Sequence, residues 1–171
     1  MTLRAAFQMD PIENLVIRGD SSFALMLEAR RRGHELLYYR PGDLLMREAR
    51  AFAHMRPVEV RDEEGDHYTL GERTLMPLSD CDVVMLRQDP PFDMSYITTT
   101  HILEAAGEKT LVVNDPASVR NSPEDEKIKS RSASRGLSFR DLILRLGVSR
   151  VDQDRDPPCT WNQQSDQIEP L

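Results

Sequence analysis

Residues 82–93 read DVVMLRQDPPFD. Four consecutive apolar side chains, residues 83–86, form the kind of unbroken run that is typical of a parallel strand covered on both faces. Two prolines end the strand, and a helix is predicted at about residues 93–106. A buried strand that leads into a helix is the unit from which α/β domains are built. This segment therefore predicts an α/β fold.

The alternation of strands and helices continues on both sides of this segment. Strands are predicted at residues 3–9, 35–39, 82–87 and 110–113, and helices at residues 20–33 and 93–106. In the first helix, Phe23, Met26 and Leu27 have the spacing of a buried stripe. Residues 50–78 are interpreted as a β-hairpin insertion, because apolar and charged side chains alternate on either side of a turn at residues 64–66.

This order of elements predicts a central parallel sheet with right-handed crossovers. We expect the four main strands in the order 2-1-3-4, which is common in small doubly wound sheets. Ligands of such sheets bind beyond the carboxyl ends of the strands, where the strand order reverses. Residues 9–12 and residues 87–93 meet at that point, so both loops are candidate binding loops.

Polar residues of these loops and of the first helix are candidate site residues. Arg87 can hold a carboxylate through two parallel hydrogen bonds, and the prolines after Asp89 stiffen its loop. Asp10 follows the first strand, and Ser21 lies at a helix N-terminus, where anions bind readily. Each observation also has a structural interpretation. Arg87 can pair with Asp89 or Asp93 inside its own loop, and Ser21 can belong to an ordinary helix cap.

The composition argues against several classes of function. The formal net charge of the 171-residue chain is −7, which argues against nucleic acid as a partner. No apolar run approaches the ~18 residues of a membrane span, and no secretory signal is expected because the first residues lead straight into a strand. Cys81 and Cys159 are too few for a disulfide framework, which favours the cytoplasm. Neither a Gly-x-Gly-x-x-Gly motif nor a P-loop is present.

Isolated histidines and cysteines predict no metal site. The four histidines lack the spacing of metal ligands and are interpreted as surface residues: His34, His54, His67 and His101. Cys81 directly precedes a buried strand and has no histidine beside it in sequence, so we interpret it as a packing thiol.

The composition changes near residue 121. Eight of the ten aromatic residues lie before that point, and the sequence after it is rich in Ser, Arg, Asp, Pro and Gln. Such a sequence can bury little apolar surface, so a largely disordered tail is expected. Residues 139–146 are an exception, because their apolar spacing permits a short amphipathic helix. We therefore expect a domain at residues 1–121 and a tail at residues 122–171.

Several short stretches, in their order and spacing, resemble a known family. Residues 86–93, LRQDPPFD, give the strongest match to the N-terminal domain of prokaryotic glutathione synthetase, a member of the ATP-grasp superfamily. The other matching stretches are Met9–Ile12, Asp20–Ala24, Leu27–Gly33, Pro41–Leu44, Val112–Pro116 and Ser118–Asn121. The resemblance covers residues 3–122 and implies a Rossmann-like pre-ATP-grasp domain.

The resemblance implies one part of an enzyme. The complete family enzyme joins γ-glutamylcysteine to glycine with ATP and Mg²⁺ through an acyl phosphate, because a carboxylate is a poor electrophile until it is phosphorylated. The nucleotide, both metals and most charge-stabilising groups belong to the later domains, and the family is typically oligomeric, so a homo-oligomer is expected. The N-terminal domain forms one wall of the peptide-substrate site, and the residues expected there are Asp10, Ser21, Arg87 and Asp89.

The resemblance does not continue beyond Asn121. No glycine-rich loop, metal-binding carboxylate or ATP-binding lysine can be matched there, so no catalytic, cofactor-binding or metal-binding residue is assigned. We expect neither ATP nor Mg²⁺ to bind this chain alone, and a frameshifted or truncated gene would explain the tail. The leading interpretation is a substrate-side domain that is inactive by itself. The alternative is a non-enzymatic binding or assembly module that pairs with a full-length synthetase. A related peptide-forming ligase is disfavoured by residues 87–93.

Overall fold

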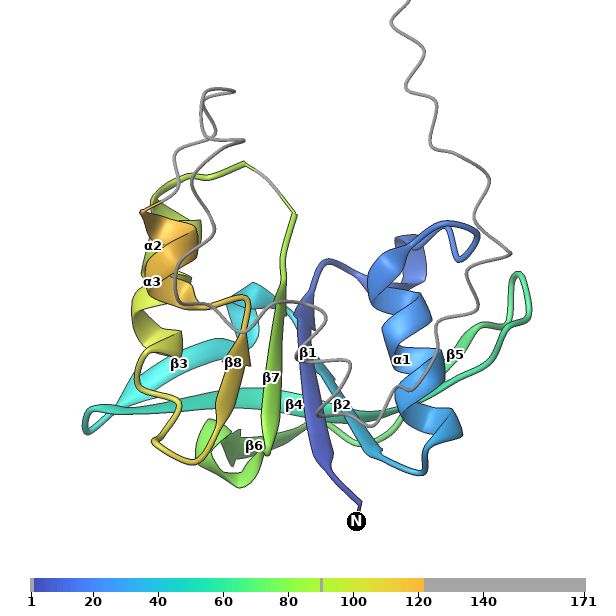
Figure 1. Cartoon of the computed structure of the whole chain (residues 1–171), viewed down its shortest axis with the longest axis horizontal. Coiled ribbons are helices and arrows are strands. Elements are labelled where there is room, and N and C mark those ends of the chain that lie inside the picture. The colour runs from blue at the N-terminus through green and yellow to red at the C-terminus, as the bar shows by residue number, and fades with distance from the viewer. Residues whose placement is uncertain (1, 90, 122–171) are drawn as a thin grey trace, which may run out of the picture. The chain divides into compact units, whose positions relative to one another are not determined.

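Four parallel strands form the centre of the domain. The computed structural model describes residues 2–89 and 91–121 (Figure 1). Hydrogen bonds join the four strands in the order β2-β1-β7-β8, which confirms the order 2-1-3-4 expected from the sequence. Their bounds are β1 (Arg4–Met9), β2 (Glu35–Tyr39), β7 (Val83–Arg87) and β8 (Leu111–Val113).

The register of β1 and β7 places the two candidate loops side by side. Ala5 pairs with Val83, and Met9 pairs with Arg87 at the other end of the two strands. Because the strands are parallel, the residues that follow Met9 and Arg87 leave the sheet at the same edge. The loops that the sequence predicted to meet are therefore neighbours.

Helices cover both faces of the parallel strands. One face carries a buried cluster in which Ala6, Leu37 and Val84 pack with Leu103 of α2 (Met94–Leu103). Side chains alternate along a strand, so the neighbouring residues face the other way. Helix α1 (Ser21–Arg31) contacts β2 and β4. In Figure 1, α1 lies on one side of the parallel strands, and α2 lies on the other side with α3 (Pro116–Arg120).

The predicted hairpin insertion is confirmed and proves larger than expected. Its long strand β4 (Arg50–Val60) pairs antiparallel with β2 at Arg56 and Pro57, and with β5 (Tyr68–Leu70) from Val58 onward. The first half of β4 also pairs with β3 (Leu44–Arg47) and β6 (Thr74–Pro77). Thus β4 links the parallel strands to a small antiparallel sheet, and the alanines and methionine on its inner side complete the core.

Some local expectations need correction. Phe23 and Met26 are buried as predicted, but Leu27 is only half-buried. Helix α2 ends at Leu103 instead of residue 106, and Ala105 and Ala106 follow it in tighter turns. The interpretation of His67 as a surface residue is wrong, because its ring is packed against Phe23 and only 7% exposed.

Other expectations concern the ends of the domain and the membrane. The described residues contain no helix that is long and apolar enough to span a bilayer. The expected tail at residues 122–171, with its short helix at 139–146, lies outside the described residues, and the domain boundary at residue 121 stays a prediction.

Candidate functional site

A hydrogen bond joins the two candidate loops at the carboxyl ends of β1 and β7. The Asp89 backbone N–H donates to Oδ2 of Asp10 over 2.8 Å. Asp10 is half-buried, whereas Asp89 is exposed. The backbone amide of Asp89 makes this contact. The carboxylate of this exposed residue takes no part in it. This contact fixes the distance between two loops that are far apart in sequence.

Arg87 binds the first turn of α1. Its Nε donates to Oγ of Ser22 over 2.9 Å, and its Nη2 donates to Oγ of Ser21 over 2.6 Å. Both serines are in place because Asp20 caps the helix by accepting the Phe23 N–H over 2.7 Å. The strand β7 therefore holds the guanidinium from one side and α1 holds it from the other.

The internal pairing considered for Arg87 is not what the structure shows. Asp93 caps α2 by accepting the Tyr96 N–H over 2.9 Å, and Asp89 contacts the β1 loop. Among residues 2–89 and 91–121, no carboxylate forms an ion pair with Arg87. The partners of its guanidinium there are neutral hydroxyls, which leave its positive charge uncompensated.

The four predicted residues thus form two contacts at one edge of the sheet, Asp10 with Asp89 and Ser21 with Arg87. Arg87 is half-buried and has N–H groups beyond the two that bind the serines. The first turn of α1 adds the positive end of a helix dipole to this charge. An anionic group such as a carboxylate is the ligand that this combination favours.

Sequence reasoning missed polar residues next to this site. Ser22 is 4% exposed and accepts a hydrogen bond from Arg87 over 2.9 Å, beside the predicted Ser21 at 2.6 Å. The Gln8 side chain is fully buried in β1, and its Nε2 donates to Oε1 of Gln88 over 3.3 Å. A polar residue inside an apolar strand was the available signal for Gln8, since buried amides need a partner. No comparable signal distinguishes Ser22 from any other residue in a helix cap.

The described residues do not fit a metal ion. They contain no group of three or more His, Cys, Asp and Glu side chains that could hold one. The Asp10 carboxylate accepts the Asp89 backbone N–H, and the Asp89 carboxylate takes no part in this contact. No step that uses a metal is derived from this part of the chain.

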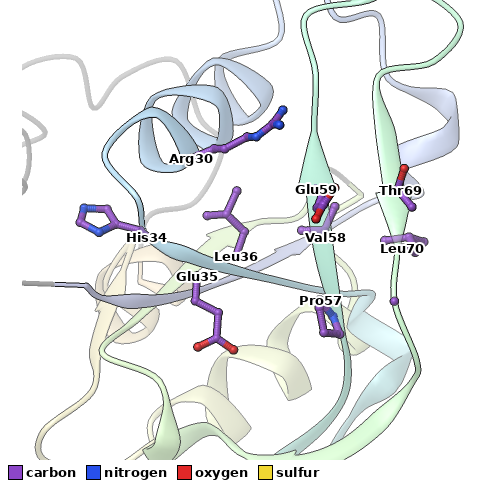
Figure 2. A pocket seen from close by; sticks show the side chains of 10 residues that line it. Arg30, His34, Glu35, Leu36, Pro57, Val58, Glu59, Thr69 and Leu70 are labelled. Carbon is purple, nitrogen blue, oxygen red and sulfur yellow. The ribbon is translucent and has the colours of Figure 1, made fainter.

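A separate cavity lies at the opposite end of β2. Its volume is about 480 Å³, and it opens between the end of α1, the start of β2 and strands β4 and β5 (Figure 2). Arg30 extends over it and donates a hydrogen bond to the Val60 carbonyl. The described residues that line this cavity include none of the four predicted site residues.

The strand order and the paired loops at its reversal define an α/β domain of the Rossmann-like type. A family model described as the N-terminal domain of prokaryotic glutathione synthetase matches residues 3–120, and this chain belongs to that family. The match includes both candidate loops and the whole hairpin insertion.

Curated relatives support the same assignment. The chain is 61% identical over 124 residues to a glutathione synthetase of Mesorhizobium japonicum, 59% to that of Brucella melitensis and 47% to that of Escherichia coli K12. The alignments cover 72%, 72% and 71% of this chain. The chain spans only about 40% of the length of these relatives.

Proposed function

We propose that residues 1–121 supply the substrate-side wall of a glutathione synthetase, the ATP-dependent ligase that joins γ-glutamylcysteine to glycine. The observation that carries this proposal is the Arg87 guanidinium at the reversal of the strand order, which two hydroxyls of α1 hold and which has no carboxylate partner among residues 2–89 and 91–121. The family match and the relatives, which are named glutathione synthetases, support this proposal.

Each candidate residue has a distinct proposed part. Arg87 binds a carboxylate of γ-glutamylcysteine through its remaining N–H groups, and the Ser21 hydroxyl lies beside it as a further polar contact. The exposed Asp89 carboxylate suits an ammonium group of the same peptide. Asp10 keeps the two loops together through the Asp89 amide, so it shapes the site more than it contacts the ligand.

ATP and Mg²⁺ complete the proposal for the whole enzyme. Bound to that enzyme, they would activate the peptide carboxylate by phosphorylation and neutralise the charge that develops in the transfer. We propose that the residues that hold them belong to the later ATP-grasp part of the family, that neither binds this chain alone, and that the complete enzyme works in the cytoplasm. The chain by itself is then a binding domain without catalytic activity.

The test compares the chain with a fusion. Residues 1–121 are joined to the part of the Mesorhizobium japonicum relative that follows the matched region, and both proteins are assayed for glutathione with γ-glutamylcysteine, glycine, ATP and Mg²⁺. The fusion is expected to form glutathione, and the chain alone is expected to match a no-protein control. Glutathione formation by the chain alone, or a folded but inactive fusion, would contradict the proposal.

A further inference from the structure

Side chains from elsewhere in the fold hold both backbone groups of the first residue in the turn that follows Asp10. This turn is η1 (Ile12–Asn14), and Ile12 is fully buried. The Ile12 N–H donates to Oη of Tyr38 over 3.3 Å, and the Ile12 carbonyl lies 2.8 Å from Nε2 of His67. Within the turn, the Ile12 carbonyl also accepts the Leu15 N–H over 3.3 Å, so His67 adds a second donor to it, and Tyr38 supplies the acceptor for the Ile12 N–H.

Tyr38 connects this turn directly to Asp10. Its hydroxyl donates to the Asp10 carbonyl over 3.3 Å and accepts from Nε of Arg40 over 3.2 Å. Arg40 in turn pairs with Glu13, which lies in the same turn. The Tyr38 hydroxyl therefore uses its single proton on Asp10 and its lone pairs on two donors, and its pKa is raised by burial.

His67 reaches the same turn from the hairpin insertion. It lies just before β5, and its ring packs edge-on against Phe23 of α1 with centroids 5.6 Å apart. A carbonyl can only accept a hydrogen bond, so Nε2 of His67 carries the proton. The other ring nitrogen, Nδ1, is buried and has no hydrogen-bond partner among the described residues. The contact with Ile12 is thus the polar interaction that orients this ring.

We infer that His67 and Tyr38 are positioning residues that hold the Asp10 loop in the place where it meets Asp89. The contacts themselves need no ligand. The inference therefore rests on the proposed function only for the expected effect on substrate affinity. It gives the hairpin insertion a role at the site: the insertion delivers a donor to Ile12 from 55 residues away in the chain.

Loss of the His67 donor has a predictable local effect. His67→Phe keeps an aromatic ring against Phe23 but leaves the buried Ile12 carbonyl with only the Leu15 N–H as its donor, at 3.3 Å, and the loss of a hydrogen bond to a buried group is costly. The loop should then open more often, so the Asp89 amide should exchange with solvent about fivefold faster or more. His67 and Tyr38 together form a clamp on this turn. Tyr38→Phe removes the hydroxyl that bonds to Ile12 and Asp10, and it should accelerate exchange of the Asp89 amide in the same way.

The experiment measures amide hydrogen exchange by NMR in the full 171-residue chain. The variants are His67→Phe, Tyr38→Phe and His67→Gln, which retains an N–H donor without the ring. His54→Phe is the matched control, since it makes the same substitution in β4 of the same insertion. The amide of Ala6 in the buried β1 strand reports global opening.

We expect faster exchange of the Asp89 amide in His67→Phe and Tyr38→Phe, unchanged exchange at Ala6, and partial restoration in His67→Gln. His54→Phe should leave both amides unchanged. Equal acceleration at Asp89 and Ala6 would show general destabilisation, and unchanged exchange at Asp89 would show that the loop does not depend on the clamp. Either result would overturn the inference.

A second measurement separates this inference from the proposed function. Binding of γ-glutamylcysteine is titrated by calorimetry for the full chain and for the same variants. If the unaltered chain does not bind, the proposed function of residues 1–121 is in doubt while the exchange result still decides the role of the clamp. If it binds, His67→Phe should weaken binding about fivefold or more, with His67→Gln recovering part of the loss.

Discussion

Arg87→Lys is the sharpest test of the candidate site, because lysine keeps the positive charge and loses the planar fork. Arg87 makes two hydrogen bonds inside the domain, one to Ser22 over 2.9 Å and one to Ser21 over 2.6 Å. The substitution therefore has an internal cost as well as an effect on ligand binding, and the two must be measured separately.

The two effects have different expected sizes. Each hydrogen bond to a serine contributes roughly 0.5–1.5 kcal/mol, and the lysine ammonium can replace one of them. A net loss of about 1 kcal/mol lowers the Tm of a domain of this size by about 3–5 °C. Loss of two-point binding to a substrate carboxylate costs at least ~1.4 kcal/mol, which is a factor of about ten in affinity.

The assay uses the fusion that carries the later part of the Mesorhizobium japonicum relative. Arg87→Lys is expected to raise KM for γ-glutamylcysteine about tenfold or more at a temperature well below Tm. Arg56→Lys is the matched control, because Arg56 also donates from Nε, to the Gly71 carbonyl, but lies in the hairpin insertion. An unchanged KM together with a lower Tm for Arg87→Lys would assign this residue a structural role and refute the reasoning.

Three further predictions concern the fold. Neighbouring arginines lower the pKa of Glu28 to about 2, so its stabilising effect is present above pH ~4.5 and is lost as the pH falls through about 2. Glu28→Gln should therefore flatten the pH dependence of the unfolding free energy in that interval by about 0.5–1 kcal/mol, measured by urea titration. Burial raises the pKa of the Cys81 thiol to about 12, so this thiol should be unreactive in the folded protein at pH 8. In a Cys159→Ser variant, a thiol reagent should therefore label the protein only after denaturant is added. Rapid labelling of the native protein would contradict this prediction. Gly33 has φ of +75° at the end of α1, so Gly33→Ala should cost about 1 kcal/mol, whereas Gly42→Ala in open space should be nearly neutral by thermal unfolding.

The parts of the fold that the sequence predicted are those with a local physical signal. The apolar run at residues 83–86 marks a strand covered on both faces, and the cap at Asp20 marks where α1 begins. Right-handed crossovers then leave few ways to order four parallel strands. The meeting of the two candidate loops followed from that order alone.

The remaining features depend on contacts between distant residues. Nothing local shows that β4 pairs with four different strands, since each half of it alternates like any amphipathic strand. His67 resembles a surface residue in a charged turn until α1 brings Phe23 against it. The structure likewise does not show the alternative in which Arg87 pairs inside its own loop, because Arg87 binds two serines of α1 and the Asp93 carboxylate caps α2.

The candidate site is assembled entirely from such distant contacts. The hydrogen bonds of Tyr38 and His67 to Ile12 span 26 and 55 residues, and that of Asp89 to Asp10 spans 79. Loop closures of this length are stable only when the sheet that joins them is complete, so the site and the fold should form together. A folded domain at residues 1–121 would then present Arg87 and both loops in fixed positions before any later domain is added. Such preorganisation lowers the entropy lost on binding, which is why we expect the isolated chain to bind peptide substrate measurably even without catalysis.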